Sequence, residues 1–132
     1  SQGQYKQALE NYEKSLAMDQ TVYGDVDHPS IAISYLSIGN VYKSQGQYTQ
    51  ALENYEKSLA MGQAIYGNVD HPSIANCYEN IGRANEALGS YSAAEEYYER
   101  CLAIRIAVYS SPDHLYTDDV RRLLDCLRQR AG

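Results

Sequence analysis

The chain has 132 residues, of which 11 are basic and 17 acidic, so its formal net charge is −6 at pH 7. The imbalance lies in residues 1–113, which carry 7 basic against 14 acidic side chains. Such a surface repels phosphate backbones, and we expect no nucleic-acid partner. No apolar run approaches the ~20 residues of a membrane-spanning helix, and no signal-peptide pattern opens the chain, so we expect no membrane partner either.

Three cysteines bear on the compartment. Cys77, Cys101 and Cys126 show no CxxC pairing and are odd in number, a pattern typical of a reducing environment rather than of a disulfide framework. We therefore expect a cytoplasmic protein.

A unit of 43 residues is repeated along the chain. Residues 1–32 recur at 44–75 with 27 of 32 aligned positions identical, and a more diverged third copy keeps the same register. A period of this length is typical of a solenoid, in which each unit buries its apolar face only when a neighbour stacks on it. The repeat therefore predicts an all-α fold, an α-solenoid of tandem antiparallel helix pairs.

The apolar spacing predicts six helices. Within one unit, Tyr48, Ala51, Tyr55 and Leu59 follow the i, i+3, i+4, i+7 pattern of a helix face. An Asp-His-Pro triplet then gives a helix start signal, because proline is tolerated in the first helical turn. We expect helices at about 4–23, 29–45, 47–66, 72–88, 90–109 and 114–130.

Glycines occupy two kinds of position in this pattern. Gly46 and Gly89 stand between expected helices, where a tight turn requires a positive φ. Gly39 and Gly82 stand inside helices, where glycine costs about 1 kcal/mol relative to alanine. We expect close packing of a partner helix at both interior positions.

Most of the 14 tyrosines recur at the repeat interval, which argues for a core role rather than a stacking platform for nucleic acid. Eleven are expected on buried helix faces: Tyr5, Tyr48, Tyr91, Tyr12, Tyr55, Tyr98, Tyr23, Tyr66, Tyr109, Tyr35 and Tyr78.

The repeated residues resemble a known family. Tyr35-x2-Ile38-Gly39-x2-Tyr42, followed by Ala51-x3-Tyr55, resembles the tetratricopeptide repeat (TPR), whose pattern is W-x2-L-G-x2-Y and then A-x3-F. The long period and the Tyr-Gly-x-x-Asp-His-Pro joint resemble the kinesin-light-chain-like subclass. The resemblance implies a right-handed superhelix in which the first helix of each pair lines a concave groove.

The resemblance also implies a function, that of a non-enzymatic scaffold for protein–protein interaction that binds a peptide segment of a partner protein. An alternative is a regulatory or oligomerisation array within a larger signalling or enzymatic protein. The expected groove residues lie off the buried stripe of each first helix: Ile33, Leu36, Asn40, Lys43, Asn76, Glu79, Arg83, Glu86 and Arg122. Arg83 and Glu79, spaced i, i+4, could instead satisfy each other on a solvated surface.

Other groups of polar residues favour structural roles. His28, His71 and His114 stand one period apart and beside helix starts, so we expect them to form helix starts rather than to bind a metal. Glu95, Glu96 and Glu99 are expected on a solvated face completed by Arg100. No arrangement for catalysis or for a cofactor is evident, and we predict no enzyme activity and no cofactor.

The organisation predicted is one repeat array over residues 1–132, with units at about 1–43, 44–86 and 87–113 and a polar capping helix at 114–130. Asp125 takes the place of the interior glycines in this last helix. Ser1 aligns with a position in the middle of a unit, so we expect an excerpt of a longer protein. The first helix lacks a preceding partner, which leads us to expect self-association through that end.

Overall fold

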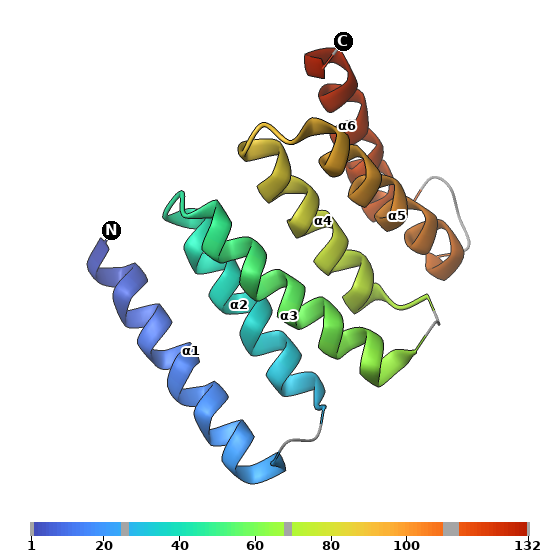
Figure 1. Ribbon diagram of the computed structural model, residues 1–132. Helices are drawn as coiled ribbons and strands as arrows, with labels where there is room; N and C mark the ends of the chain where they lie inside the picture. Colours follow the sequence, from blue (N-terminus) through green and yellow to red (C-terminus); the bar gives the residue numbers. More distant parts are fainter. Residues whose placement is uncertain (1, 25–26, 68–69, 110–113, 132) are drawn as a thin grey trace. The chain divides into compact units, whose positions relative to one another are not determined.

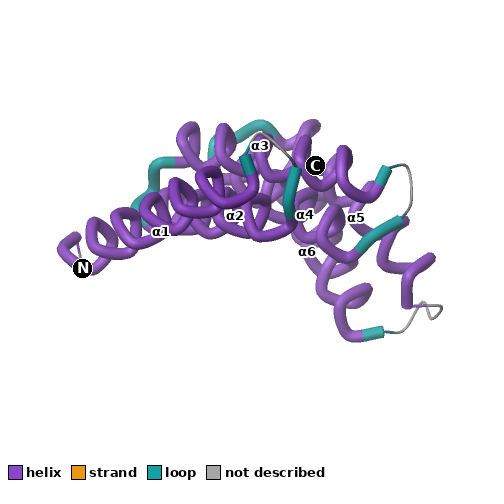
Figure 2. Tube along the Cα trace, turned by 90° about the horizontal axis from the view of Figure 1, so that it is seen from below, coloured by secondary structure: helices purple, strands orange, loops and turns teal. Residues whose placement is uncertain are grey.

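The computed structural model describes residues 2–24, 27–67, 70–109 and 114–131, and the regular secondary structure in these ranges is entirely helical (Figures 1 and 2). Every predicted helix is confirmed, with ends within two residues of those expected. The predicted unit boundary at residue 113 lies outside the described residues. The helices are α1 (Gln2–Tyr23), α2 (Pro29–Ser44), α3 (Tyr48–Tyr66), α4 (Pro72–Ala87), α5 (Tyr91–Tyr109) and α6 (Leu115–Ala131).

The chain divides into two compact units, Ser1–Gly67 and Asn68–Gly132, which we call the first and the second unit. The first contains α1, α2 and α3, and the second α4, α5 and α6; within each, consecutive helices run antiparallel (Figure 1). These units differ from the 43-residue sequence units, because a sequence copy begins at α3 whereas α3 packs on the preceding α2. The Ser58 hydroxyl of α3, for example, donates to the Ala32 carbonyl of α2 at 2.8 Å.

A histidine caps each of α2, α4 and α6, and in α2 and α4 it belongs to an Asp-His-Pro triplet. The Nδ1 atom of His28 accepts a hydrogen bond from the Ser30 N–H at 3.1 Å, which satisfies one of the unpaired donors at the start of α2. The same bond recurs at His71 and His114. Tyr23, at the end of α1, stacks on the His28 ring with 3.7 Å between centroids. The predicted role of these histidines in helix starts is confirmed.

The turns within helix pairs use glycine as predicted. Gly46 and Gly89 have φ values of 78° and 82°, in the left-handed region that only glycine enters without steric cost. Their N–H groups donate to carbonyls of the preceding helix, Gly46 to Lys43 and Gly89 to Glu86, both at 3.0 Å. Each turn therefore closes the helix before it.

Each unit is centred on a tyrosine packed against an interior glycine. A Cβ atom added at Gly39 would lie 2.6 Å from the Tyr55 ring, and one added at Gly82 would lie 2.5 Å from the Tyr98 ring. Both tyrosines are fully buried. The predicted close approach of the paired helices is confirmed at both glycines.

Of the eleven tyrosines expected on buried helix faces, Tyr55 and Tyr98 are fully buried, seven are half-buried and two are exposed. Tyr12 is 38% exposed and Tyr23 is 39% exposed. Both belong to α1, which packs on α2 in the first unit and contains no fully buried residue. The register identified the face correctly, but a face is buried only where a second helix covers it.

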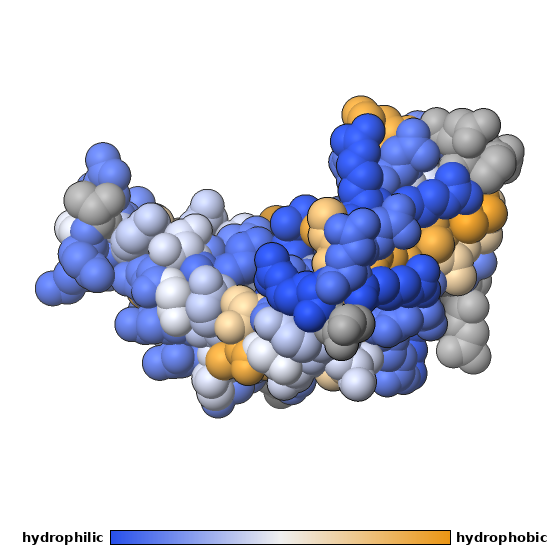
Figure 3. All heavy atoms as spheres, turned by 90° about the horizontal axis from the view of Figure 1, so that it is seen from above, coloured by the Kyte–Doolittle hydropathy of each residue, from blue (hydrophilic) through white to orange (hydrophobic). Residues whose placement is uncertain are grey.

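The face of the molecule seen in Figure 3 is mostly hydrophilic, and its hydrophobic residues gather in patches among polar ones. The described residues contain no helix that is both long and apolar enough to cross a membrane.

Candidate functional site

The four groove positions predicted on α2 include one prominent apolar side chain. Ile33 is 61% exposed, whereas Leu36, Asn40 and Lys43 are half-buried. The Oδ1 atom of Asn40 accepts a hydrogen bond of 2.6 Å from the buried Tyr55 hydroxyl. The side-chain oxygen of Asn40 is therefore bonded to a core residue, while the residue itself is half-buried on α2.

Two of the positions predicted on α4 are occupied by contacts within the second unit. Arg105, which is only 6% exposed, extends from α5 and donates to the Glu79 carboxylate at 2.7 Å and to the Asn76 side-chain oxygen at 3.0 Å. It also donates to the Tyr116 carbonyl of α6 at 3.3 Å. Arg105 thus connects three helices, and Asn76 and Glu79 hold it in place.

The Glu79 carboxylate lies between two arginines, Arg105 and Arg83, and pairs with both. Its second carboxylate oxygen accepts from the Arg83 Nε at 3.1 Å, the i, i+4 pairing considered from the sequence. Burial raises the pKa of the Glu79 carboxyl, but the hydrogen bond and charge of Arg105, together with those of Arg83, outweigh burial and hold this pKa below its usual value. Glu79 is therefore ionised at neutral pH.

A groove of about 240 Å³ lies between α4 and α6, with Tyr98 of α5 contributing to its lining. Glu86 of α4 accepts hydrogen bonds from the Tyr98 hydroxyl and from the Arg130 guanidinium of α6, both at 3.1 Å. Arg83 and Leu123 also line it. The groove therefore combines two arginines, one carboxylate and a short apolar stretch.

The two buried tyrosines donate to acceptors at different repeat positions, Tyr55 to Asn40 of α2 and Tyr98 to Glu86 of α4. Tyr55 uses Asn40, but Arg83 occupies the equivalent place in the second unit and cannot accept. Tyr98 therefore donates to Glu86, one turn further along. Burial, followed by the charge of Glu86 and the hydrogen bond to it, raises the pKa of Tyr98, so this phenol stays protonated.

Of the predicted groove residues, the structure brings Arg83 and Glu86 together in this groove. Arg122 does not line it; its side chain is 75% exposed, and its nearest anionic partner is Asp119 at 3.8 Å. Arg130 does line it and was not predicted. On α6 this groove is lined by Leu123 and Arg130, which are seven residues apart, whereas Arg122 stays a predicted contact outside it.

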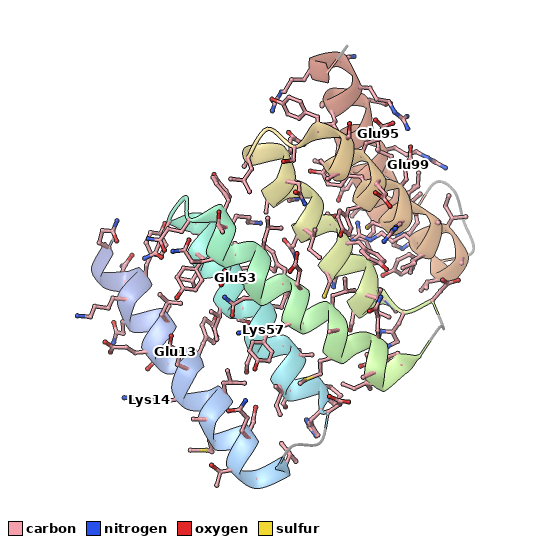
Figure 4. The ribbon with its side chains drawn as sticks, viewed as in Figure 1. Glu13, Lys14, Glu53, Lys57, Glu95 and Glu99 are labelled. Atoms are coloured by element: carbon pink, nitrogen blue, oxygen red, sulfur yellow. The ribbon has the colours of Figure 1, made fainter. Side chains whose placement is uncertain are left out.

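The acidic residues of α5 are paired on a second surface. Arg128 of α6 donates to Glu95 at 3.2 Å and to Glu99 at 3.0 Å, and these two carboxylates project from neighbouring turns of α5 (Figure 4). The hydrogen bond from Arg128 to Glu95 is the main cause that raises the Arg128 pKa. Arg100 pairs only with Glu96. The predicted solvated face is present, but Arg128 contributes more to it than the expected Arg100.

The three cysteines form no disulfide. Burial raises the pKa of Cys101 to about 12, so its thiol is protonated at neutral pH, and Cys77 is also buried. Cys126 is exposed. Within the described ranges, no group of three or more His, Cys, Asp or Glu side chains is arranged to hold a metal ion.

Comparison with known proteins connects this geometry to a family. The sequence pattern of the tetratricopeptide repeat matches residues 1–64 and again residues 30–107. The chain belongs to the tetratricopeptide repeat family. Proteins of the TPR family are generally scaffolds for protein–protein interaction and typically lack enzyme activity. No curated protein sequence matches the chain.

Solved structures place this TPR chain beside kinesin-light-chain-like proteins. It is 28% identical to a kinesin-light-chain-like protein of Podosopora anserina with nearly identical TPR-like repeats, with a TM-score of 0.83 over 99% of this chain and 61% of that one. A variant of that protein with one glutamine replaced by methionine gives 28% identity and a TM-score of 0.79, over 96% of this chain and 58% of that one.

BtubC (BKLC) from P. vanneervenii shares the TPR fold at 21% identity, with a TM-score of 0.86 over 98% of this chain and 50% of that one. The chain thus spans between half and about three fifths of the length of these structures. The suspected kinesin-light-chain-like subclass is confirmed.

Proposed function

We propose that this chain is a non-enzymatic, cytoplasmic scaffold that binds a peptide segment of a partner protein, with the principal site formed by α4 and α6 of the second unit. The observation that carries the proposal is the groove between α4 and α6, which is lined by Arg83, Glu86 and Arg130. Its volume of about 240 Å³ is smaller than the ~300–1,000 Å³ typical of small-molecule pockets. A groove of this size suits one or two side chains of a polypeptide.

The charges in the groove favour an acidic side chain or a terminal carboxylate in the ligand. Arg83 and Arg130 have side chains that are 43% and 57% exposed, and exposed ion pairs of this kind contribute only ~0–1 kcal/mol. Either arginine can therefore exchange its glutamate for a ligand carboxylate and bind it bidentately. Arg105 does not line this groove; it is buried against Glu79 and connects the helices.

The face of α2 would supply a different kind of contact. Ile33 offers exposed apolar surface, and Leu36, Asn40 and Lys43 lie along the same helix. An apolar anchor together with an amide and a cation fits a mixed peptide sequence better than a uniformly charged one. The predicted groove positions on α2 and α4 all differ between the copies, which supports a role in recognition. Four core residues, by contrast, recur one period later: Ile31, Ile38, Ala51 and Tyr55.

The absence of activated groups in the described part of the chain supports a binding role. The Cys101 thiol is buried and protonated, and Glu95 and Glu99 are both held by Arg128. The three cysteines form no disulfide, which supports a reducing compartment.

The test is selection of binding sequences from a displayed library of random peptides, with affinities then measured by calorimetry. We expect selected peptides to be enriched in Asp and Glu. The double variant Arg83→Ala with Arg130→Ala should weaken their binding by about tenfold or more, since two charge-assisted contacts are lost.

The matched control removes two arginines from the other surface, Arg100→Ala with Arg128→Ala, and should leave binding within about twofold of wild type. Equal losses in both double variants, with helical content unchanged, would show that net charge rather than the groove determines binding and would contradict the proposal.

A further inference from the structure

The groove between α4 and α6 holds a carboxylate beside its two arginines. Glu86, whose side chain is only 21% exposed, accepts hydrogen bonds from the Tyr98 hydroxyl and the Arg130 guanidinium, both at 3.1 Å. Because Tyr98 is fully buried in α5, its hydrogen bond holds Glu86 at a fixed place in the groove. A ligand can therefore take Arg130 away from Glu86, but Glu86 stays in the lining.

A second carboxylate lies next to the groove. The Arg83 Nε donates to Glu79 at 3.1 Å, and the other oxygen of Glu79 accepts from the buried Arg105 at 2.7 Å. Burial is the main cause that raises the Tyr98 pKa. The charges of Glu86 and Glu79 raise this pKa further, and the charge of Arg83 lowers it. These charges therefore lie close enough together to act on the same hydroxyl.

The sum of these charges indicates which anion the groove can neutralise. Two ion-paired groups form the charged network in and beside the groove, Arg105–Glu79–Arg83 and Glu86–Arg130. Three positive and two negative charges leave one positive charge. One ligand carboxylate neutralises it, whereas a phosphorylated side chain carries about −1.5 to −2 at pH 7 and leaves an excess of negative charge beside two glutamates.

We propose that Glu86 makes this groove select a single carboxylate of a peptide and reject a phosphorylated side chain. The inference rests on the proposed function, because it concerns the ligand of the same groove. Arg83 and Arg130 can bind either anion, so the arginines do not distinguish the two. Discrimination requires a repulsive element, and the Glu86 carboxylate lies next to any anion that Arg130 holds.

The core does not require a charge at this position. In the first unit the buried Tyr55 hydroxyl donates to Asn40, so a neutral acceptor is sufficient for a tyrosine of this kind. Lys43 stands one period before Glu86, and the sign of the charge is therefore reversed between the copies. The negative charge of Glu86 is a property of this groove rather than of the common interior.

The test uses pools of short synthetic peptides with acetylated and amidated ends, uncharged flanking residues and either glutamate or phosphoserine at the centre. Each pool carries a neutral fluorophore, and its apparent Kd for the full chain is measured by anisotropy. We expect wild type to bind the glutamate pool about tenfold more tightly than the phosphoserine pool. Glu86→Gln keeps an acceptor for Tyr98 and should reduce this ratio by about tenfold.

A third pool has glutamine at the centre and a free carboxyl end. Tighter binding of either carboxylate pool than of the phosphoserine pool supports the proposal, and the pool that binds shows whether the carboxylate comes from a side chain or from a chain end.

The control variant is Glu95→Gln, which changes the net charge by the same amount on the surface where Glu95 pairs with Arg128. It should keep the wild-type ratio. A second measurement needs no variant: at about pH 5 phosphoserine, whose second pKa is about 6, is mainly a monoanion. Wild type should then bind the glutamate and phosphoserine pools within about threefold of each other.

Two kinds of failure are distinguishable. Equal binding of the carboxylate and phosphoserine pools by wild type at pH 7, or a ratio unchanged in Glu86→Gln at equal helical content, would overturn the selectivity proposal alone if Arg83→Ala with Arg130→Ala still abolishes binding. Binding of none of the pools, or binding that survives this double variant, would overturn the proposed function and the selectivity proposal together.

Discussion

The contact between Gly82 and Tyr98 shows how one residue without a side chain determines the separation of two helices. The Tyr98 ring is fully buried and occupies the space that a Cβ on Gly82 would need. Gly39 and Tyr55 repeat the arrangement in the first unit. Glycine lowers the intrinsic stability of a helix, but here it permits a buried aromatic side chain that contributes more.

We expect Gly82→Ala to lower the free energy of unfolding by about 1–2 kcal/mol, because overpacking against a fixed ring outweighs the gain in helix propensity. Urea denaturation followed by circular dichroism measures the change. Gly3→Ala is the control, since nothing lies within 4 Å of a Cβ at Gly3, and it should leave stability unchanged or slightly raised. A variant at Gly82 as stable as wild type would contradict this account.

Sequence reasoning located these glycines because they recur at a fixed register. It could not locate Arg105, because the equivalent residue one period earlier is Gly62 and the comparison of copies gave no signal. Nor could it give the acceptor of the Tyr98 hydroxyl, which moved to a neighbouring turn. Features common to all units were therefore predictable, whereas the polar contacts that distinguish one unit from another required the structure.

At the scale of elements, α4, α5 and α6 are joined by a buried charge. Arg105 contacts Glu79 and Asn76 of α4 and the backbone of Tyr116 of α6. Its charge is compensated by Glu79, and removing one member of a buried ion pair costs more than the pair contributes, because the remaining charge is left without a partner. The packing of these three helices therefore depends on Glu79 remaining ionised.

This dependence predicts an acid-sensitive second unit. The folded-state pKa of Glu79 lies below its unfolded value, so its contribution is fully present above the unfolded pKa and is lost as the pH falls through the folded one. We expect wild-type stability to fall more steeply than that of Glu79→Gln below about pH 4. At pH 7, Glu79→Gln should be less stable by a few kcal/mol.

Urea denaturation across this pH range measures both effects. Glu96→Gln is the control, because the ion pair of Glu96 with Arg100 is exposed and contributes little. Parallel pH profiles for wild type and Glu79→Gln would contradict the assignment.

At the scale of the whole molecule, the distribution of charge limits the class of partner. The net charge is −6, and the acidic excess lies in residues 1–113. The two largest buried side chains, Tyr55 and Tyr98, cannot stack on bases, although Tyr12, Tyr23 and Tyr116 are exposed. Proteins and peptides are therefore the partners that this surface favours.

We expect no binding of a labelled single-stranded oligonucleotide in a mobility-shift assay at about 0.15 M salt, because the acidic surface repels the phosphates. The control is the same titration at low salt, where a purely electrostatic contact would strengthen. Binding in the micromolar range at either salt concentration would contradict the prediction.

The shifted acceptor of the buried tyrosine has a consequence for how such a scaffold can diversify. The buried tyrosine hydroxyl can donate to a residue at either of two positions, one helical turn apart, on the preceding helix. Only one of these two positions therefore has to hold an acceptor. The other can carry a cation, as Lys43 does in the first unit and Arg83 in the second. Recognition residues can thus be exchanged between neighbouring turns, unit by unit, while the glycine–tyrosine contact beneath them is kept.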